Sequence, residues 1–328
     1  MGEAEGTSRQ PLTDDYIICI PSYKRLDTFS KYTYGKLLEP YELCSKVKLF
    51  LQNDEDVSAY GAKFPGLEIV RSPPGLLNTV NFISDYFALD QKLVLMHDDV
   101  DRLWFLSPVG RRTDFADASA LDAFIKQSFR ILESKQLHLG GVYSKDDPRA
   151  AKQQKDKHGD YSTDLNFIHD PFTLLRNQDI KLDIELEQKM DFHRTIEYYK
   201  QDGGVLRWNK YGLKTFKFNP EDSESTGGFG HRSAEMEQEA AKKIQDRYPQ
   251  YVERITTDAK GNSILASPTS PACFDRNASR WLRRARSTLN SFAWANRISR
   301  MRPALAAYSL PFRAAKVDSW SGPRAPLR

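Results

Sequence analysis

The amino-acid sequence predicts an α/β protein with a mostly parallel sheet. Short apolar runs rich in β-branched residues alternate along the chain with segments in which apolar residues recur at every third and fourth position. This is the pattern of strands connected by amphipathic helices, from which parallel sheets are built. Three of the apolar runs end in polar clusters, at residues 21–25, 52–54 and 97–101. Because ligands of such sheets bind beyond the carboxyl ends of the strands, we expect these clusters to converge on one crevice.

The clearest of these elements lie in the N-terminal part of the chain. Prolines, glycines or polar residues end each apolar run there, so the boundaries are well marked. We predict strands at residues 16–20, 46–51, 67–70 and 93–96, and helices at residues 29–38 and 77–87.

The second part of the chain gives a more mixed pattern. The stretch 145–160 is charged and poor in apolar residues, which favours a loop that could be mobile. After residue 266 the periodicity is lost in a Ser-Pro-Thr-Ser-Pro run. Between these limits we predict helices at residues 118–132, 185–199 and 232–248, a strand at 137–143, an apolar segment at 163–175 and a hairpin at 205–218.

Length and composition indicate one folded domain with polar ends. Of the 328 residues, 40% are hydrophobic and 12% aromatic, which suffices for a substantial core. Residues 1–15 are polar and acidic, so we predict a disordered N-terminus, a domain at 16–266 and a C-terminal extension at 267–328. The chain shows no secretory signal and no apolar run of about 18 residues. We therefore expect a soluble cytoplasmic protein without integral membrane contact.

The C-terminal extension is strongly basic. Residues 276–328 carry eleven Arg and one Lys against one acid, a net charge of +11, so the remainder of the chain is −7 because the total is +4. Such a segment can bind the phosphates of DNA, with aromatic side chains stacking on bases. The alternatives to DNA binding are that it lies on anionic lipid or packs against the acidic body. The candidate DNA contacts are Arg280, Trp281, Arg283 and Arg284.

The cluster His97-Asp98-Asp99-Val100-Asp101 follows the apolar run at residues 93–96. Three crowded acids repel one another unless a cation lies among them, and hard cations such as Mn²⁺ and Mg²⁺ prefer carboxylate oxygens. We therefore predict Asp99 and Asp101 as ligands of a divalent metal, with Asp98 in support; such an ion can neutralise the phosphates of a bound ligand. The alternative is a solvated acidic loop.

Two further segments carry candidate site residues. Gly227 and Gly228 lie in a glycine-rich loop, where the backbone can approach phosphates closely. Asp191 follows Glu187 by one helical turn and is a candidate general base for an acceptor hydroxyl. The alternative for Asp191 is an acid on a solvated helix face.

The motifs occur in a distinctive order. They are Ile20-Pro-Ser-Tyr-Lys-Arg25, Gly75-Leu-Leu-Asn-Thr-Val-Asn-Phe-Ile83, Asp98-Asp-Val-Asp101, Asp164-Leu-Asn-Phe-Ile168, Asp191-Phe-His-Arg-Thr195, Asp202-Gly-Gly-Val205, Arg207 and Gly227-Gly228. This order resembles the GT-A glycosyltransferases and, more narrowly, the TET-associated glycosyltransferases of phages, large viruses and some eukaryotes. The resemblance covers residues 16–265. This chain departs from the family at Met190 and His193, where acidic residues are usual.

The resemblance implies a GT-A fold, which is Rossmann-like and binds a nucleotide sugar, with a basic helical extension at the C-terminus. It implies a glycosyltransferase that uses a nucleotide sugar, most commonly a UDP-sugar, with Mn²⁺ or Mg²⁺. In that case Pro21, Ser22, Arg25, Asp98 and Asp99 border the nucleotide, Asn81 borders the donor site, Asp191 and Arg194 face the acceptor or the sugar, and His231 is a late metal ligand.

The family also implies an acceptor, the hydroxymethyl group of a 5-hydroxymethylpyrimidine in DNA, chiefly 5-hydroxymethylcytosine. The cytoplasm would be that of the host if the protein is encoded by a bacteriophage. One alternative is a glycosyltransferase of polysaccharide or lipid-linked sugar assembly at a membrane surface. Another is a sugar- or nucleotide-binding module without turnover.

Overall fold

The computed structural model describes residues 9–216, 234–252, 255–257 and 263–265. The chain divides into two compact units, Met1–Phe274 and Asp275–Arg328, and every described residue belongs to the first. The predicted basic extension therefore lies outside the described residues. Its predicted start at residue 267 stays a prediction.

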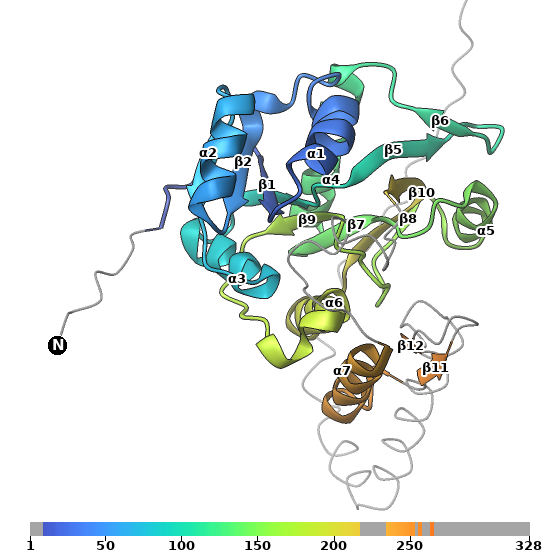
Figure 1. The fold of residues 1–328 in the computed structure, drawn as a ribbon. Helices are drawn as coiled ribbons and strands as arrows, with labels where there is room; N and C mark the ends of the chain where they lie inside the picture. The colour runs from blue at the N-terminus through green and yellow to red at the C-terminus, as the bar shows by residue number, and fades with distance from the viewer. Residues whose placement is uncertain (1–8, 217–233, 253–254, 258–262, 266–328) are drawn as a thin grey trace, which may run out of the picture. The chain divides into compact units, whose positions relative to one another are not determined.

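A ten-stranded mixed sheet forms the centre of the first unit (Figure 1). Its strands follow the order β3-β2-β1-β4-β9-β7-β10-β5-β6, and β8 pairs with β10. Seven of these ten strands run in one direction, whereas β5, β8 and β9 run in the opposite one. The strands are β1 Ile17–Ser22, β2 Val47–Leu51, β3 Glu68–Arg71, β4 Lys92–Met96, β5 Val100–Leu106, β6 Arg112–Asp114, β7 Leu139–Tyr143, β8 Tyr161–Ser162, β9 Phe172–Arg176 and β10 Leu206–Thr215.

Helices cover both faces of this sheet, which confirms the predicted α/β class. One face packs with residues of η1, α2 and α4, and the other with residues of α3 and α6. A small hairpin, β11 Ile255–Thr257 with β12 Ser263–Leu265, follows the last helix. The helices are α1 Leu26–Phe29, η1 Ser30–Leu38 (a π-helix), η2 Cys44–Lys46 (3₁₀), α2 Asp54–Lys63, α3 Leu76–Tyr86, α4 Ala118–Ser134, α5 Pro148–His158, η3 Ile184–Lys189 (3₁₀), α6 Met190–Asp202 and α7 Ala234–Arg247.

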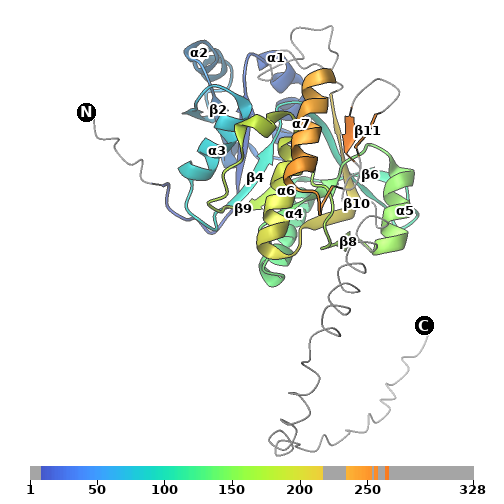
Figure 2. The ribbon, with the colours of Figure 1, turned by 90° about the horizontal axis from the view of Figure 1, so that it is seen from below.

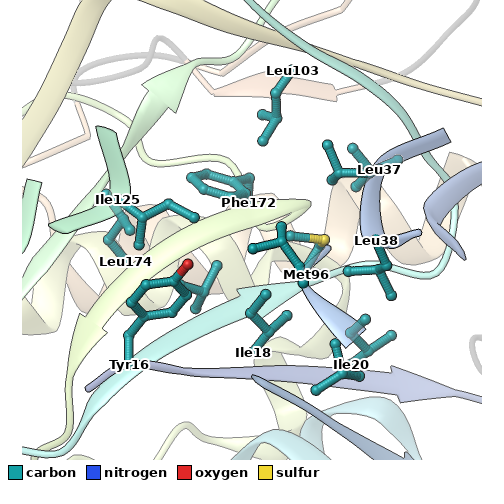
Figure 3. Packing of buried hydrophobic residues seen from close by; sticks show 14 of the residues in the cluster. Tyr16, Ile18, Ile20, Leu37, Leu38, Met96, Leu103, Ile125, Phe172 and Leu174 are labelled. Atoms are coloured by element: carbon teal, nitrogen blue, oxygen red, sulfur yellow. The ribbon is translucent and has the colours of Figure 1, made fainter. Parts of the chain in front are cut away.

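The largest apolar cluster lies between the sheet and the helices of the first face (Figure 3). Ile18, Met96 and Phe172 come from three adjacent strands and are fully buried. Leu37 and Ile125 meet them from η1 and α4. This packing fixes where β1 and β4 end, and so it fixes the position of the polar residues that follow them. None of the described helices is long and apolar enough to cross a membrane.

A third cluster joins the C-terminal helices. Leu186 and Ile196 pack against Ala241, Ile244 and Tyr248, so α6 and α7 lie side by side (Figure 2). The predicted helix at 232–248 is thus confirmed in its described part, since α7 spans Ala234–Arg247.

The charged stretch at 145–160 is a helix, and the prediction of a loop was wrong. The side chain of Asp147 accepts hydrogen bonds from the backbone of Arg149 and Ala150, and Pro148 occupies the first turn. Ala151 is the one fully buried residue among the described residues of α5. The helix therefore depends on its cap and on charged surface pairs such as Lys152 with Asp156 rather than on an apolar stripe.

Two other predictions differ from the structure. The segment at 205–218 was expected to form a hairpin, but β10 is one long strand. It pairs with β8 near its start, with β5 from Tyr211 onward, and with β7 both near its start and at Gly212. The N-terminal segment was expected to be disordered up to residue 15. Instead Gln10 forms a parallel bridge with Phe87, and the backbone of Thr13 donates to Gln91. Its described part is thus tied to the end of α3.

Candidate functional site

The carboxyl ends of β1 and β4 bring Ser22 and Asp98 together. Ser22 Oγ donates to Asp98 Oδ2 at 2.6 Å and lies 2.7 Å from the hydroxyl of Tyr60. Since the Ser22 proton goes to the carboxylate, the Tyr60 hydroxyl donates to Ser22. Both Ser22 and Asp98 are buried, and Pro21 is buried beside them. Two of the predicted polar clusters, at 21–25 and 97–101, therefore converge.

Arg25 completes this group from the loop that precedes α1. Its Nη1 lies 2.8 Å from Asp98 Oδ1, and its Nη2 donates to Asp99 Oδ2 at 3.1 Å. Burial raises the pKa of Asp98 to about 6; Arg25 opposes this rise, while Asp99 adds to it. One guanidinium thus joins two adjacent carboxylates.

Asp101 has partners of its own. Lys36 from η1 contacts Oδ1, and Lys214 from β10 lies 2.6 Å from Oδ2. The Asp101 side chain is 7% exposed, whereas those of Lys36 and Lys214 are 46% and 45% exposed. Burial acts to raise the pKa of Asp101, but the hydrogen bonds from Lys214 and Lys36 outweigh it and the pKa is lowered.

Thr33 and Phe216 hold the acidic loop in place. The Thr33 hydroxyl donates to the carbonyl of His97 at 2.9 Å and accepts from the backbone of Val100 at 2.9 Å. The backbone of Phe216 donates to the carbonyl of Asp99 at 2.8 Å. Thr33 lies in η1, and π-helical turns are frequent at functional sites. The loop between β4 and β5 is therefore fixed from both sides.

A second charged group lies on the other side of β4. Asp170 precedes β9, which pairs antiparallel with β4, and Arg194 Nη1 of α6 donates to Asp170 Oδ1 at 2.7 Å. Both side chains are largely buried, and burial raises the pKa of Asp170 against the effect of Arg194. Asp191 also raises this pKa, so its carboxylate is near. Asp191 lies in the first turn of α6 and is partly exposed.

Asp170 was not among the predicted site residues. Its signal in the sequence is weak, because a single acid between a histidine and a proline has no characteristic spacing. Asp170 lies two residues before the strand Phe172–Arg176. A strand antiparallel to its neighbour begins at the edge where that neighbour ends. Knowing that β9 runs antiparallel would therefore have indicated Asp170.

Several predicted residues have other partners. Both ends of the Asn81 amide bond to the backbone of Leu182, at 2.8 and 2.9 Å, so Asn81 holds the segment before η3. Glu187 accepts a hydrogen bond from the backbone of Leu77 and caps α3. Arg194, expected to face the acceptor or the sugar, is 4% exposed at its side chain and pairs with Asp170.

The third polar cluster, at 52–54, supports the local backbone. Gln52 accepts from the backbone of Gly75 at 2.9 Å, and Asn53 caps α2. Asp56 of the same helix accepts from the backbone of Lys24 at 2.9 Å, which ties α2 to the segment that carries Arg25.

Some predicted site residues fall outside the described residues. They are Gly227, Gly228, His231, Arg280, Trp281, Arg283 and Arg284. Their assignments stay predictions.

In the described part of the chain, basic side chains and Ser22 already contact most carboxylate oxygens of the acidic cluster, and the predicted third ligand, His231, lies outside that part, so the assignment of Asp99, Asp101 and His231 to a metal stays a prediction. Both oxygens of Asp98 and both of Asp101 have partners, and so does Oδ2 of Asp99. Asp99 Oδ1 is the one carboxylate oxygen of this cluster with no hydrogen-bond partner in the described part of the chain. Within that part, no three His, Cys, Asp or Glu side chains are grouped as metal ligands. Asp101 in particular forms ion pairs with Lys36 and Lys214.

No family model and no curated protein sequence matches the chain. Among solved structures, residues 1–349 of S. aureus TarS align with 71% of this chain and 66% of that chain, slightly less than two thirds, at 11% identity and a TM-score of 0.41. Glucosyl-3-phosphoglycerate synthase of Mycobacterium tuberculosis, in complex with Mn²⁺, UDP and glucosyl-3-phosphoglycerate, aligns with 77% of this chain and 86% of that chain, at 10% identity and a TM-score of 0.40. Likenesses at this level assign neither a family nor an activity.

Proposed function

We propose that this protein is a glycosyltransferase that uses a nucleotide-sugar donor and acts at the carboxyl edge of β1 and β4. The observation that carries the proposal is the bridge from Arg25 to Asp98 and Asp99 at the point where two parallel strands end. In α/β sheets this edge is where nucleotides bind. Cations there suit the diphosphate of a donor, and a carboxylate suits the hydroxyl groups of its ribose or sugar.

The proposed reaction breaks the bond between the anomeric carbon and the diphosphate. The acceptor hydroxyl attacks that carbon, its proton passes to a carboxylate, and the electron pair of the broken bond leaves with the diphosphate. In this proposal Arg25 stabilises the departing negative charge. Asp191 is the acceptor-side base in this proposal, because it is partly exposed near the buried pair of Asp170 and Arg194.

For the acceptor we propose the hydroxymethyl group of 5-hydroxymethylcytosine, or of the corresponding uracil derivative, in DNA. Two features support it: the resemblance of the motif order to TET-associated glycosyltransferases, and the net charge of +11 on residues 276–328. A basic segment gives sequence-independent affinity for DNA through release of counterions.

The rival acceptor is a polysaccharide or lipid-linked sugar at a membrane surface, since an arginine-rich segment with Trp and Leu also suits anionic lipid. A binding module without turnover is the rival of a different class. It predicts tight binding of a nucleotide sugar and no hydrolysis or transfer.

The proposal is tested by incubating the full chain with UDP- and GDP-sugars and either DNA containing 5-hydroxymethylcytosine or the same DNA containing cytosine. The nucleosides are then weighed by mass spectrometry. We expect a hexose or pentose adduct on the hydroxymethylated base alone, and its loss in Asp191→Asn. Transfer to a lipid-linked acceptor but not to DNA would support the membrane rival. Donor binding without hydrolysis or transfer to any acceptor would contradict the proposed activity.

A further inference from the structure

Lys36 and Lys214 approach one carboxylate from two different elements. Lys36 lies in η1 and Lys214 in β10, and each contacts its own oxygen of Asp101. Asp101 is almost fully buried, but nearly half of each lysine side chain is open to solvent. An ammonium has three donors, so each lysine can bind Asp101 and still offer donors to a ligand.

The backbone around both lysines is held firmly. The register of β10 against β5 shifts between Lys214 and Thr215: Lys214 pairs with Arg102 and Thr215 with Val100, so Asp101 is the residue of β5 that is passed over. Beyond it, Phe216 stacks on Tyr32 of η1 with ring centroids 4.7 Å apart. The amine of Lys36 lies 4.9 Å from the centre of the Tyr32 ring. The end of β10 and η1 are thus joined next to the two amines.

The charges of this edge balance without a bound ion. Asp98, Asp99 and Asp101 contribute three negative charges, and Arg25, Lys36 and Lys214 contribute three positive ones. Crowded carboxylates require a cation, and here the chain itself supplies three. A donor diphosphate that arrives at this edge brings new negative charge, and the half-exposed lysines are positioned to meet it.

We infer that Lys36 and Lys214 form a binding site for the diphosphate of a nucleoside diphosphate, with Asp101 as the residue that positions both amines. The inference rests on the proposed function and deepens it. It assigns to Asp101 a role different from that of a metal ligand. Binding of a nucleoside diphosphate then persists when divalent cations are removed.

The test measures binding of UDP and of GDP to the full chain by calorimetry, once with excess EDTA and once with Mn²⁺. Lys36→Met and Lys214→Met each remove one amine, and Lys36→Arg keeps the charge. Lys31→Met is the matched control, because Lys31 also lies over the Tyr32 ring, with its amine 5.2 Å from the ring centre, but contacts none of the three acids. Thermal unfolding of each variant verifies that it is folded.

We expect the wild type to bind one of the two nucleotides in EDTA. Each methionine variant should weaken that binding about tenfold, as loss of a charge-assisted hydrogen bond does. Lys36→Arg and Lys31→Met should bind within about twofold of the wild type. Binding that requires Mn²⁺ and is unchanged in folded Lys36→Met and Lys214→Met would overturn this inference and leave the proposed function standing. Absence of binding in both buffers would overturn both.

Discussion

Replacing Arg194 by methionine should destabilise the protein strongly, because it breaks a buried ion pair with Asp170. Arg194 Nη1 is 2.7 Å from Asp170 Oδ1, and the two side chains are 4% and 11% exposed. Methionine fills much of the volume of the arginine but leaves the Asp170 carboxylate buried without its cation. Removing one partner of a buried pair costs about 3–5 kcal/mol.

That cost has a measurable size and a pH dependence. For a domain of this length, 1 kcal/mol lowers the melting temperature by about 2–4 °C, so Arg194→Met should melt about 10 °C lower at pH 8. Burial already raises the pKa of Asp170, and loss of Arg194 removes the effect that opposes this rise. The folded variant therefore takes up a proton more readily than the unfolded chain. The stability difference between wild type and Arg194→Met should therefore shrink as the pH falls from 8 toward 5.

The assay is urea unfolding at pH 8 and pH 5, with a matched control. Arg247 and Asp183 also lie 2.7 Å apart, but their side chains are 46% and 32% exposed. Arg247→Met should therefore cost less than about 1 kcal/mol. Adding Asp170→Asn to Arg194→Met should restore part of the lost stability. A loss in Arg194→Met no larger than in Arg247→Met, or a double variant less stable than the single one, would refute the reasoning.

Two further predictions concern single side chains. Thr33→Val keeps the shape of Thr33 but removes both hydrogen bonds to the loop before β5. It should lower the free energy of unfolding, measured in urea, by about 2 kcal/mol. Thr28→Val is the control, because Thr28 makes no such bridge, and it should lower the free energy of unfolding by less than half as much. Burial lowers the pKa of His193 to about 4, so the folded protein excludes a proton that the unfolded chain binds below pH 6.5. His193 should therefore contribute about 3 kcal/mol of stability at pH 7 that is lost as the pH falls to 4. The difference in stability between pH 7 and pH 4 should be that much smaller in His193→Leu; an equal difference in both proteins would contradict the assignment.

The sequence alone determined the elements whose signal is local. The apolar runs at 16–20 and 93–96 became β1 and β4, and the helix at 118–132 became α4 with small changes of boundary. Hydrophobic periodicity is a property of neighbouring residues, so it can be read without knowledge of contacts. The convergence of residues 21–25 with 97–101 also followed from the sequence, because parallel strands that are joined by helices end at one edge.

The sequence patterns failed where stability comes from caps or from pairing. The stretch 145–160 lacks an apolar stripe, yet Asp147 and surface charge pairs make it a helix. A strand such as β10, which changes its partner along its length, has the same alternation as a hairpin until the neighbouring strands are known.

Only the tertiary structure decided the partners of the acidic cluster. The sequence predicted that Asp98, Asp99 and Asp101 require positive charge, and it suggested a metal ion as the source. That metal ion stays a prediction, but sheet pairing places Lys214, more than a hundred residues away in the chain, against Asp101, and the packing of η1 places Lys36 on its other side. Electrostatic energy depends on distance through space and on burial, and neither is encoded in the spacing of residues along the chain. The need for positive charge near these acids could therefore be predicted from neighbouring residues in the sequence, whereas the side chains that supply it could not.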